Sequence, residues 1–182
     1  MGRPAIFLDR DGTLVEEVNY LHRPEEMRLF PATAEALTKL KAAGYFLVVV
    51  TNQSGIGRGI YSEADMHSVH EALQQELGGM IDGFYHCPHL PCDGCECRKP
   101  GQKMVHDAER DLGIDLSRSW IVGDKKIDVE TGHAAGMRTV LVLTGYGRSH
   151  KDALEEHPDI IAADLGEAAA EILRLTAAEI VV

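Results

Sequence analysis

Short apolar runs alternate with amphipathic stretches along the chain. The runs predict strands at residues 5–9, 45–51, 83–86, 119–122, 139–143 and 160–162. The run at 45–51, YFLVVVT, is apolar and rich in β-branched residues, which is typical of a central parallel strand covered on both faces. Because strands follow one another with helical stretches between them, the pattern favours a parallel sheet.

The amphipathic stretches predict helices between the strands. We expect helices at 33–43, 62–77, 102–112, 129–135 and 150–156, and an alanine-rich one from about 167. Ser62 with Asp65 forms a capping-box pattern, and Gly44, Gly113 and Gly136 stand where helices end. This alternation predicts an α/β fold, a doubly wound parallel sheet with helices on both faces, in a single domain of residues 1–182.

Composition limits the kinds of partner. The 182 residues are 45% hydrophobic and 26% charged, as in an ordinary soluble globular protein. A net charge of −11 and only 5% aromatic residues argue against nucleic acid, and the charge argues against an anionic membrane. No run resembles a signal peptide or approaches a membrane span, so we expect a cytoplasmic protein. No long amphipathic interface helix stands out, which favours a monomer.

Two carboxylates, Asp9 and Asp11, follow directly on the first apolar run. Residues two apart on an extended strand point to the same side, so both carboxylates can face one site. Like charges this close repel each other unless a cation neutralises them. The pair therefore predicts a divalent metal, with one carboxylate as nucleophile and the other as acid/base.

Further reactive residues follow the ends of later predicted strands. They are Thr51, Asn52, Gln53 and Ser54 after the second strand, Asp124 and Lys125 after the strand at 119–122, and Arg98 and Lys99 ahead of a predicted helix. Ligands of doubly wound sheets bind beyond the carboxyl ends of the strands, so we expect these residues at one edge of the sheet. Each signal alone is weak, but their joint order is not explained by chance.

Four of these segments resemble the motifs of the haloacid dehalogenase-like phosphatases. They are DRDGT at 9–13, TNQSG at 51–55, RKP at 98–100 and GDKKID at 123–128. The resemblance spans roughly residues 5–148. It implies a Rossmann-like core, Mg²⁺, and hydrolysis of a phosphate ester through an aspartyl-phosphate.

The resemblance also implies a role for each catalytic residue. Asp9 is expected to attack phosphorus and form the covalent intermediate. Asp11 is expected to protonate the leaving oxygen and then to deprotonate the attacking water. The hydroxyl of Thr51 and the ammonium of Lys99 are expected to hold the phosphoryl oxygens.

The expected Mg²⁺ ligands are the carboxylates of Asp9 and Asp124 and the backbone carbonyl of Asp11, with waters and substrate completing an octahedron. The ion would offset the repulsion between the nucleophile and the phosphate. Asp128 is expected outside the ligand shell, where it orients either Lys125 or a metal-bound water.

All four cysteines lie between residues 87 and 97. A disulfide framework would spread them along the chain, so the cluster indicates a metal site, and the spacing alone also allows a Cys92–Cys95 knuckle. The pattern CPH…CxCRKP is similar to the zinc loop of one subgroup of these phosphatases. That resemblance implies Cys87, His89, Cys95 and Cys97 as Zn²⁺ ligands, with Cys92 spare. A closed site of this kind is structural, and it would stiffen the loop at 87–100.

Residues 16–24, which we call the lid segment, must lie over the site, and no insertion is large enough for a cap domain. We therefore expect a small phosphorylated sugar as substrate, although a plain surface loop remains the alternative. NQSGIGRG at 52–59 resembles the heptose-bisphosphate branch of the subgroup. The expected reaction is loss of the C7 phosphate of D-glycero-D-manno-heptose 1,7-bisphosphate, in nucleotide-activated heptose synthesis, and the alternative substrate is histidinol phosphate. The expected substrate contacts are Glu17, Asn19, Tyr20, Thr51, Asn52, Gln53, Ser54, Arg98, Lys99 and Lys125.

Overall fold

The computed structural model describes residues 2–180. Within them, six parallel strands form one sheet in the order β3-β2-β1-β4-β5-β6. The strands are β1 (Ala5–Leu8), β2 (Phe46–Asn52), β3 (Gly83–Cys87), β4 (Trp120–Gly123), β5 (Arg138–Val142) and β6 (Ile160–Ala162). The strand order reverses between β1 and β4, and sheets of this kind bind ligands at that point.

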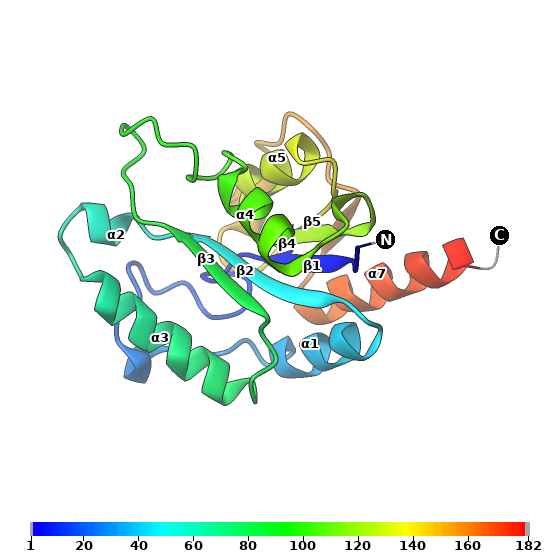
Figure 1. Cartoon of the computed structure of the whole chain (residues 1–182), viewed down its shortest axis with the longest axis horizontal. Helices are drawn as coiled ribbons and strands as arrows, with labels where there is room; N and C mark the ends of the chain where they lie inside the picture. The colour runs from blue at the N-terminus through cyan, green and yellow to red at the C-terminus, as the bar shows by residue number, and fades with distance from the viewer. Residues whose placement is uncertain (1, 181–182) are drawn as a thin grey trace.

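Helices cover both faces of the sheet, as the pattern of apolar runs predicts. They are α1 (Thr33–Ala42), α2 (Ser54–Gly57), α3 (Glu63–Glu76), α4 (Lys103–Leu112), α5 (Lys126–Ala134), α6 (Gly147–Lys151) and α7 (Leu165–Ile180), with 3₁₀ turns η1 (Pro24–Glu26) and η2 (Leu116–Arg118). In Figure 1, α4 and α5 lie on one face of the sheet and α1, α3 and α7 on the other. The predicted doubly wound α/β fold is confirmed.

Alternate side chains of β1 point to opposite faces of the sheet and contribute to the apolar layer on each face. Ile6 and Leu8 pack with buried residues of α1, α3 and α7, whereas Ala5 and Phe7 pack with those of α4. All four side chains are fully buried. Because β1 is held from both faces, the residues that follow it stand on a rigid base.

Three of the predicted helices have a limit that differs from the prediction by two residues or more. The helix predicted from 129 begins at Lys126, because the carboxylate of Asp128 accepts a hydrogen bond from the backbone N–H of Lys125 (3.0 Å) and caps the first turn. The helix predicted at 150–156 is α6, which ends at Lys151. The alanine-rich helix begins at Leu165, two residues early, and α2 was not predicted at all.

The residues after α6 fold back on α5 instead of continuing the helix. Glu155 pairs with Lys126 (2.6 Å) and Glu156 with His133 (2.7 Å). These contacts compete with helix formation, which is marginal for so short a segment. Among the helices that the structure describes, none combines the length and apolar character needed to cross a membrane.

Candidate active site

A cavity of about 180 Å³ lies beyond the carboxyl ends of β1 and β2. The residues from the sequence prediction that line it are Asp9, Asp11, Glu17, Asn19, Tyr20, Thr51, Asn52, Gln53, Ser54, Lys99 and Lys125. Its lining also includes Arg10, Tyr61 and Tyr146, which the sequence analysis did not single out. The fold therefore brings residues from five separate parts of the chain to one edge of the sheet.

Asp9 is 5% exposed and sits at the end of β1 beside a buried lysine. The Nζ of Lys99 lies 3.0 Å from Asp9 Oδ1 and 2.6 Å from Asp128 Oδ1, and it also donates to the carbonyl of Val50. Burial works to lower the pKa of Lys99, but the carboxylates of Asp128 and Asp9 hold the pKa above its ordinary value. Asp128 thus orients Lys99 through its carboxylate, and it meets Lys125 only at the backbone.

A second cation, Lys125, stands at the mouth of the cavity. Its Nζ lies 3.5 Å from Asp124 Oδ1, 3.5 Å from Glu17 Oε2 and 3.8 Å from Asp9 Oδ2. It also lies 5.1 Å from the centre of the Tyr146 ring. Burial works to raise the pKa of Asp9, but the charges of Lys99 and Lys125 outweigh it and hold the pKa below its ordinary value. Asp9 is therefore a carboxylate, as a nucleophile must be.

Asp124 carries the clearest sign of a cation site. It is fully buried, and its Oδ2 accepts the backbone N–H of Tyr146, whereas its Oδ1 has no hydrogen-bond partner among the described residues. Burial and the charge of Asp9 raise the pKa of Asp124 to about 7. Oxygens of Asp9, Asp124 and Asp128 all lie within 4.8 Å of one another. An all-oxygen donor set in which one buried carboxylate oxygen accepts no hydrogen bond from the described residues suits a hard divalent cation such as Mg²⁺.

The backbone near Asp124 is glycine for a steric reason. Gly12 has φ +82°, and a Cβ there would lie 2.1 Å from Asp124 Oδ2. A Cβ at Gly145, where φ is +50°, would lie 2.3 Å from the same oxygen. The Asp124 carboxylate therefore packs closely against two glycines, where a side chain would displace it.

Three of the expected substrate contacts are instead engaged with the protein. The amide of Asn52 holds the backbone of Lys99 at both its N–H (3.0 Å) and its carbonyl (3.2 Å). The amide of Gln53 is bonded to four protein groups. Arg98 lies outside the cavity lining, and its guanidinium donates to the carbonyl of His89. The side chains of Asn52 and Arg98 thus tie the cysteine-rich loop together and to β2.

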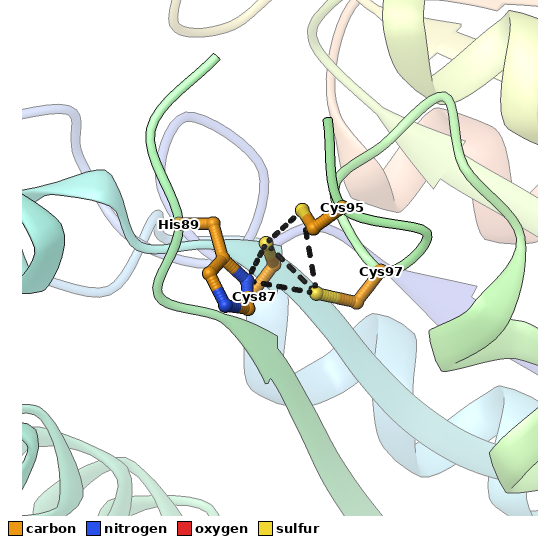
Figure 2. A group of neighbouring side chains, drawn as sticks. All are labelled: Cys87, His89, Cys95 and Cys97. Carbon is orange, nitrogen blue, oxygen red and sulfur yellow. Dashed lines mark hydrogen bonds between the residues drawn. The ribbon is translucent and has the colours of Figure 1, made fainter. Parts of the chain in front are cut away.

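The cysteine-rich loop gathers four potential metal ligands at one point. Figure 2 shows the side chains of Cys87, His89, Cys95 and Cys97 turned toward one another. Their sulfur atoms are 3.1–3.6 Å apart, and His89 Nδ1 lies 3.5 Å from Cys87 Sγ and 3.2 Å from Cys97 Sγ. Three thiols and one imidazole around a common centre could hold a metal ion of tetrahedral preference. Cys92 is exposed and takes no part in this group.

The comparisons with known proteins agree with this geometry. A family model described as HAD-hydrolase-like matches residues 96–168. The chain is 41% identical to the D-glycero-D-manno-heptose-1,7-bisphosphate 7-phosphatase of Thermosynechococcus vestitus, over 92% of this chain and 94% of that protein. It is 43% identical to the D-glycero-beta-D-manno-heptose-1,7-bisphosphate 7-phosphatase of Haemophilus ducreyi, over 80% and 86%.

A solved structure shows the same fold over nearly the whole length. The D,D-heptose 1,7-bisphosphate phosphatase of B. bronchiseptica, complexed with magnesium and phosphate, superposes with a TM-score of 0.88 at 32% identity, covering 94% of this chain and 99% of that one. The chain therefore belongs to the haloacid dehalogenase-like hydrolases. It is a phosphoric monoester hydrolase of that family, as its four motifs predict.

Proposed function

We propose that this chain removes the C7 phosphate of D-glycero-D-manno-heptose 1,7-bisphosphate. The observation that carries the chemistry is the buried Asp9 carboxylate between two ammonium groups, beside an Asp124 oxygen that accepts no hydrogen bond from the described residues. The substrate is supported by the printed activities of relatives that share at least 40% of their residues with the chain. None of those relatives carries the name of the alternative, a histidinol-phosphate phosphatase.

The residues divide the hydrolysis into two steps. Asp9 Oδ attacks phosphorus, the ester bond to the sugar oxygen breaks, and Asp11 gives that oxygen its proton. In the second step Asp11 takes a proton from water as the water attacks phosphorus, which releases phosphate and restores Asp9. Lys99 and the hydroxyl of Thr51 hold the phosphoryl oxygens where negative charge is concentrated.

Two metals complete the proposal. The carboxylates of Asp9 and Asp124 and the backbone carbonyl of Asp11 would hold Mg²⁺, which supplies positive charge against the phosphate dianion. The four-ligand cluster of the 87–100 loop would hold Zn²⁺ as a structural ion. Through Asn52 and the backbone of Lys99, the loop then keeps the lysine in place.

The lid segment would bind the sugar. Glu17, Asn19 and Tyr20 line the cavity, and Lys125 is placed to meet an anionic group at its mouth. Asn19 and Tyr20 have φ of 51° and 67°, in the left-handed region that non-glycine residues rarely occupy. Such backbone concentrates at ligand-binding segments, where the surrounding structure maintains it. Ser54 is placed on the cavity wall as a further contact.

The proposed reaction also defines the setting. A phosphatase of nucleotide-activated heptose synthesis, for lipopolysaccharide or surface glycans, would work in the cytoplasm, where the loop thiols stay reduced. We further propose a monomer with one domain, since the cavity lining is complete within one chain.

A panel of phosphate esters tests the substrate. We expect kcat/KM for both anomers of D-glycero-D-manno-heptose 1,7-bisphosphate to exceed that for histidinol phosphate by at least about a hundredfold, because two phosphates and the sugar hydroxyls contribute binding energy. Phosphate release would be measured together with NMR of the product, which must be the 1-phosphate. Equal or higher kcat/KM for histidinol phosphate, or loss of the C1 phosphate, would contradict the proposal.

A further inference from the structure

Arg10 is a fully buried arginine between the two catalytic aspartates in sequence. Its guanidinium grips the carboxylate of Asp11, with Nε 3.0 Å from Oδ2 and Nη2 3.1 Å from Oδ1. Nη2 also donates to the carbonyl of Leu21 in the lid segment and to Oε1 of Gln53. A side chain held by this many partners has a defined position, and its two hydrogen bonds to Asp11 restrict the conformation of that carboxylate in turn.

Gln53 is the second group that holds Asp11. It is 3% exposed, and its Nε2 donates to Asp11 Oδ2 (2.9 Å) and to Thr51 Oγ1 (2.8 Å). Its Oε1 accepts from Arg10 (3.1 Å) and from the hydroxyl of Tyr61 (2.5 Å). With two donors and two acceptor positions filled by the protein, this amide has nothing left for a substrate.

Tyr61 fixes the orientation of the Gln53 amide. Its hydroxyl donates only if the amide turns its oxygen toward it, which leaves the NH₂ group facing Asp11. The Tyr61 ring stacks on His22 of the lid segment, with ring centroids 5.5 Å apart. Burial raises the pKa of Tyr61 to about 12, so the hydroxyl keeps the proton that it donates.

We propose that Arg10, Gln53 and Tyr61 are positioning residues that hold the Asp11 carboxyl group where it meets the oxygen of the leaving alcohol. The inference rests on the acid/base role proposed above for Asp11. An aspartate without these partners has other side-chain conformers open to it, and a misplacement of about 1 Å can lower a rate by about a hundredfold. The network acts through Asp11 and needs no contact with the substrate.

The leaving group provides the test. The alcohol of an alkyl phosphate must leave as an alkoxide unless its oxygen receives a proton, whereas p-nitrophenolate is stable enough to leave without one. We therefore compare Tyr61→Phe and Gln53→Met with wild type on p-nitrophenyl phosphate and on the alkyl phosphate that the wild type hydrolyses fastest. The readouts are kcat and KM for the alkyl ester and the rate of the first-turnover burst of nitrophenolate, and circular dichroism checks the fold.

We expect kcat on the alkyl phosphate to fall about tenfold in Tyr61→Phe, with KM and the nitrophenolate burst within threefold of wild type. In Gln53→Met we expect kcat on the alkyl phosphate to fall about a hundredfold, with a smaller fall in the burst, because this variant also frees the hydroxyl of Thr51. The matched controls are Tyr85→Phe and Gln74→Met, which remove a tyrosine hydroxyl bonded to Asp111 and an amide bonded to Ile81 outside the site. Both controls should keep wild-type rates on both esters.

Two results would overturn the inference. One is an equal loss of rate on both esters in Tyr61→Phe, and the other is a wild-type rate on the alkyl ester in both variants. The alkyl ester is chosen because the wild type hydrolyses it fastest, whatever its structure. If the heptose bisphosphate is not the substrate, the panel of phosphate esters shows this, and the comparison between variants remains valid. If Gln53→Met does not fold, Tyr61→Phe decides the question alone.

Discussion

At the scale of single residues, the ionisation of each charged group in this site depends on the other charges buried beside it. Lys99 is 3% exposed, and its ammonium lies between the carboxylates of Asp9 and Asp128. Water cannot replace a missing partner at such a position, so each charge depends on its neighbours. Lys99, which keeps the proposed nucleophile Asp9 ionised, is therefore also a residue on which the stability of the fold depends.

Lys99→Met should lower both stability and activity. The substitution leaves the buried carboxylate of Asp128 without its cation and Asp9 with Lys125 alone, so we expect the free energy of unfolding to fall by about 3 kcal/mol, and kcat by at least about a hundredfold. Urea unfolding and phosphate release measure the two effects. Lys103→Met is the control, because Lys103 pairs with Asp107 on the surface, where water screens the charges, and should leave stability close to wild type. Equal stability of the two variants would contradict the expectation.

His70 predicts a pH dependence of stability. It is 4% exposed and stacks on Phe84, and neither ring nitrogen has a hydrogen-bond partner among the described residues. Burial, and then the charge of Arg10, lowers the pKa of His70 to about 3. Between about pH 6.5 and pH 3 only the unfolded chain binds this proton, so this contribution to stability is present above pH 6.5 and is lost as the pH falls.

From pH 7 to pH 5 this residue alone should lower the free energy of unfolding by about 2 kcal/mol. Chemical denaturation at both pH values would measure the difference, and His70→Leu should remove it. His106→Leu, at an exposed histidine beside Glu109, should leave the decline unchanged. A His70→Leu variant with the same decline as wild type would show that other groups cause it.

At the scale of elements, one irregular loop both gathers the Cys/His cluster and places Lys99 in the site. The 87–100 loop leaves the end of β3, brings its four metal-ligand side chains together and returns to the sheet edge at Lys99. Its backbone makes few regular hydrogen bonds, and long loops without such bonds are costly to order. The proposed zinc ion would offset that cost, because metal binding is coupled to the ordering of its ligands.

The loop's two kinds of cysteine should respond differently to substitution. We expect Cys95→Ser to lose the bound zinc and at least about tenfold in kcat, since it removes one of four ligands. Cys92→Ser should keep one zinc per chain and wild-type kcat, because Cys92 is exposed and outside the cluster. Metal analysis of the purified proteins and assays with Mg²⁺ present give the result. Loss of zinc from Cys92→Ser would instead support the Cys92–Cys95 knuckle.

At the scale of the whole molecule, stability and chemistry are separated in space. The proposed catalytic residues lie near the carboxyl ends of β1, β2 and β4, whereas α7 packs beside α1 on the face of the sheet opposite α4 and α5 (Figure 1). Ile172 of α7 is fully buried in that layer. The sheet connects the two regions as a rigid body, so a loss of packing there should not move the site.

Ile172→Ala tests this separation. We expect a loss of about 2–4 kcal/mol in the free energy of unfolding, from lost burial and the remaining cavity, with kcat at 25 °C within twofold of wild type. Ile161→Ala is the control, because Ile161 is 39% exposed on β6 and should cost less than about 1 kcal/mol. A large fall in kcat of folded Ile172→Ala would show that the two regions are coupled.

The sequence by itself determined the elements and the chemistry that follows them. Apolar runs with helices between them predict the doubly wound sheet, and the motifs at 9–13 and 123–128 predict the family. These features are local, since periodicity and motif spacing are properties of neighbouring residues. Even the start of α3 follows from a local capping box at Ser62, which the structure shows complete.

Only the tertiary structure decided which side chains come together in the site and which of them position others through hydrogen bonds. Arg10 and its partner Gln53 are 43 positions apart, and no local pattern records that their hydrogen bonds and that of Tyr61 are mutually satisfied. The same holds for Asp128, whose partner Lys99 is 29 positions away. A hydrogen bond depends on distance and direction in space, and these exist only once the strands have paired and the loops have closed over their ends.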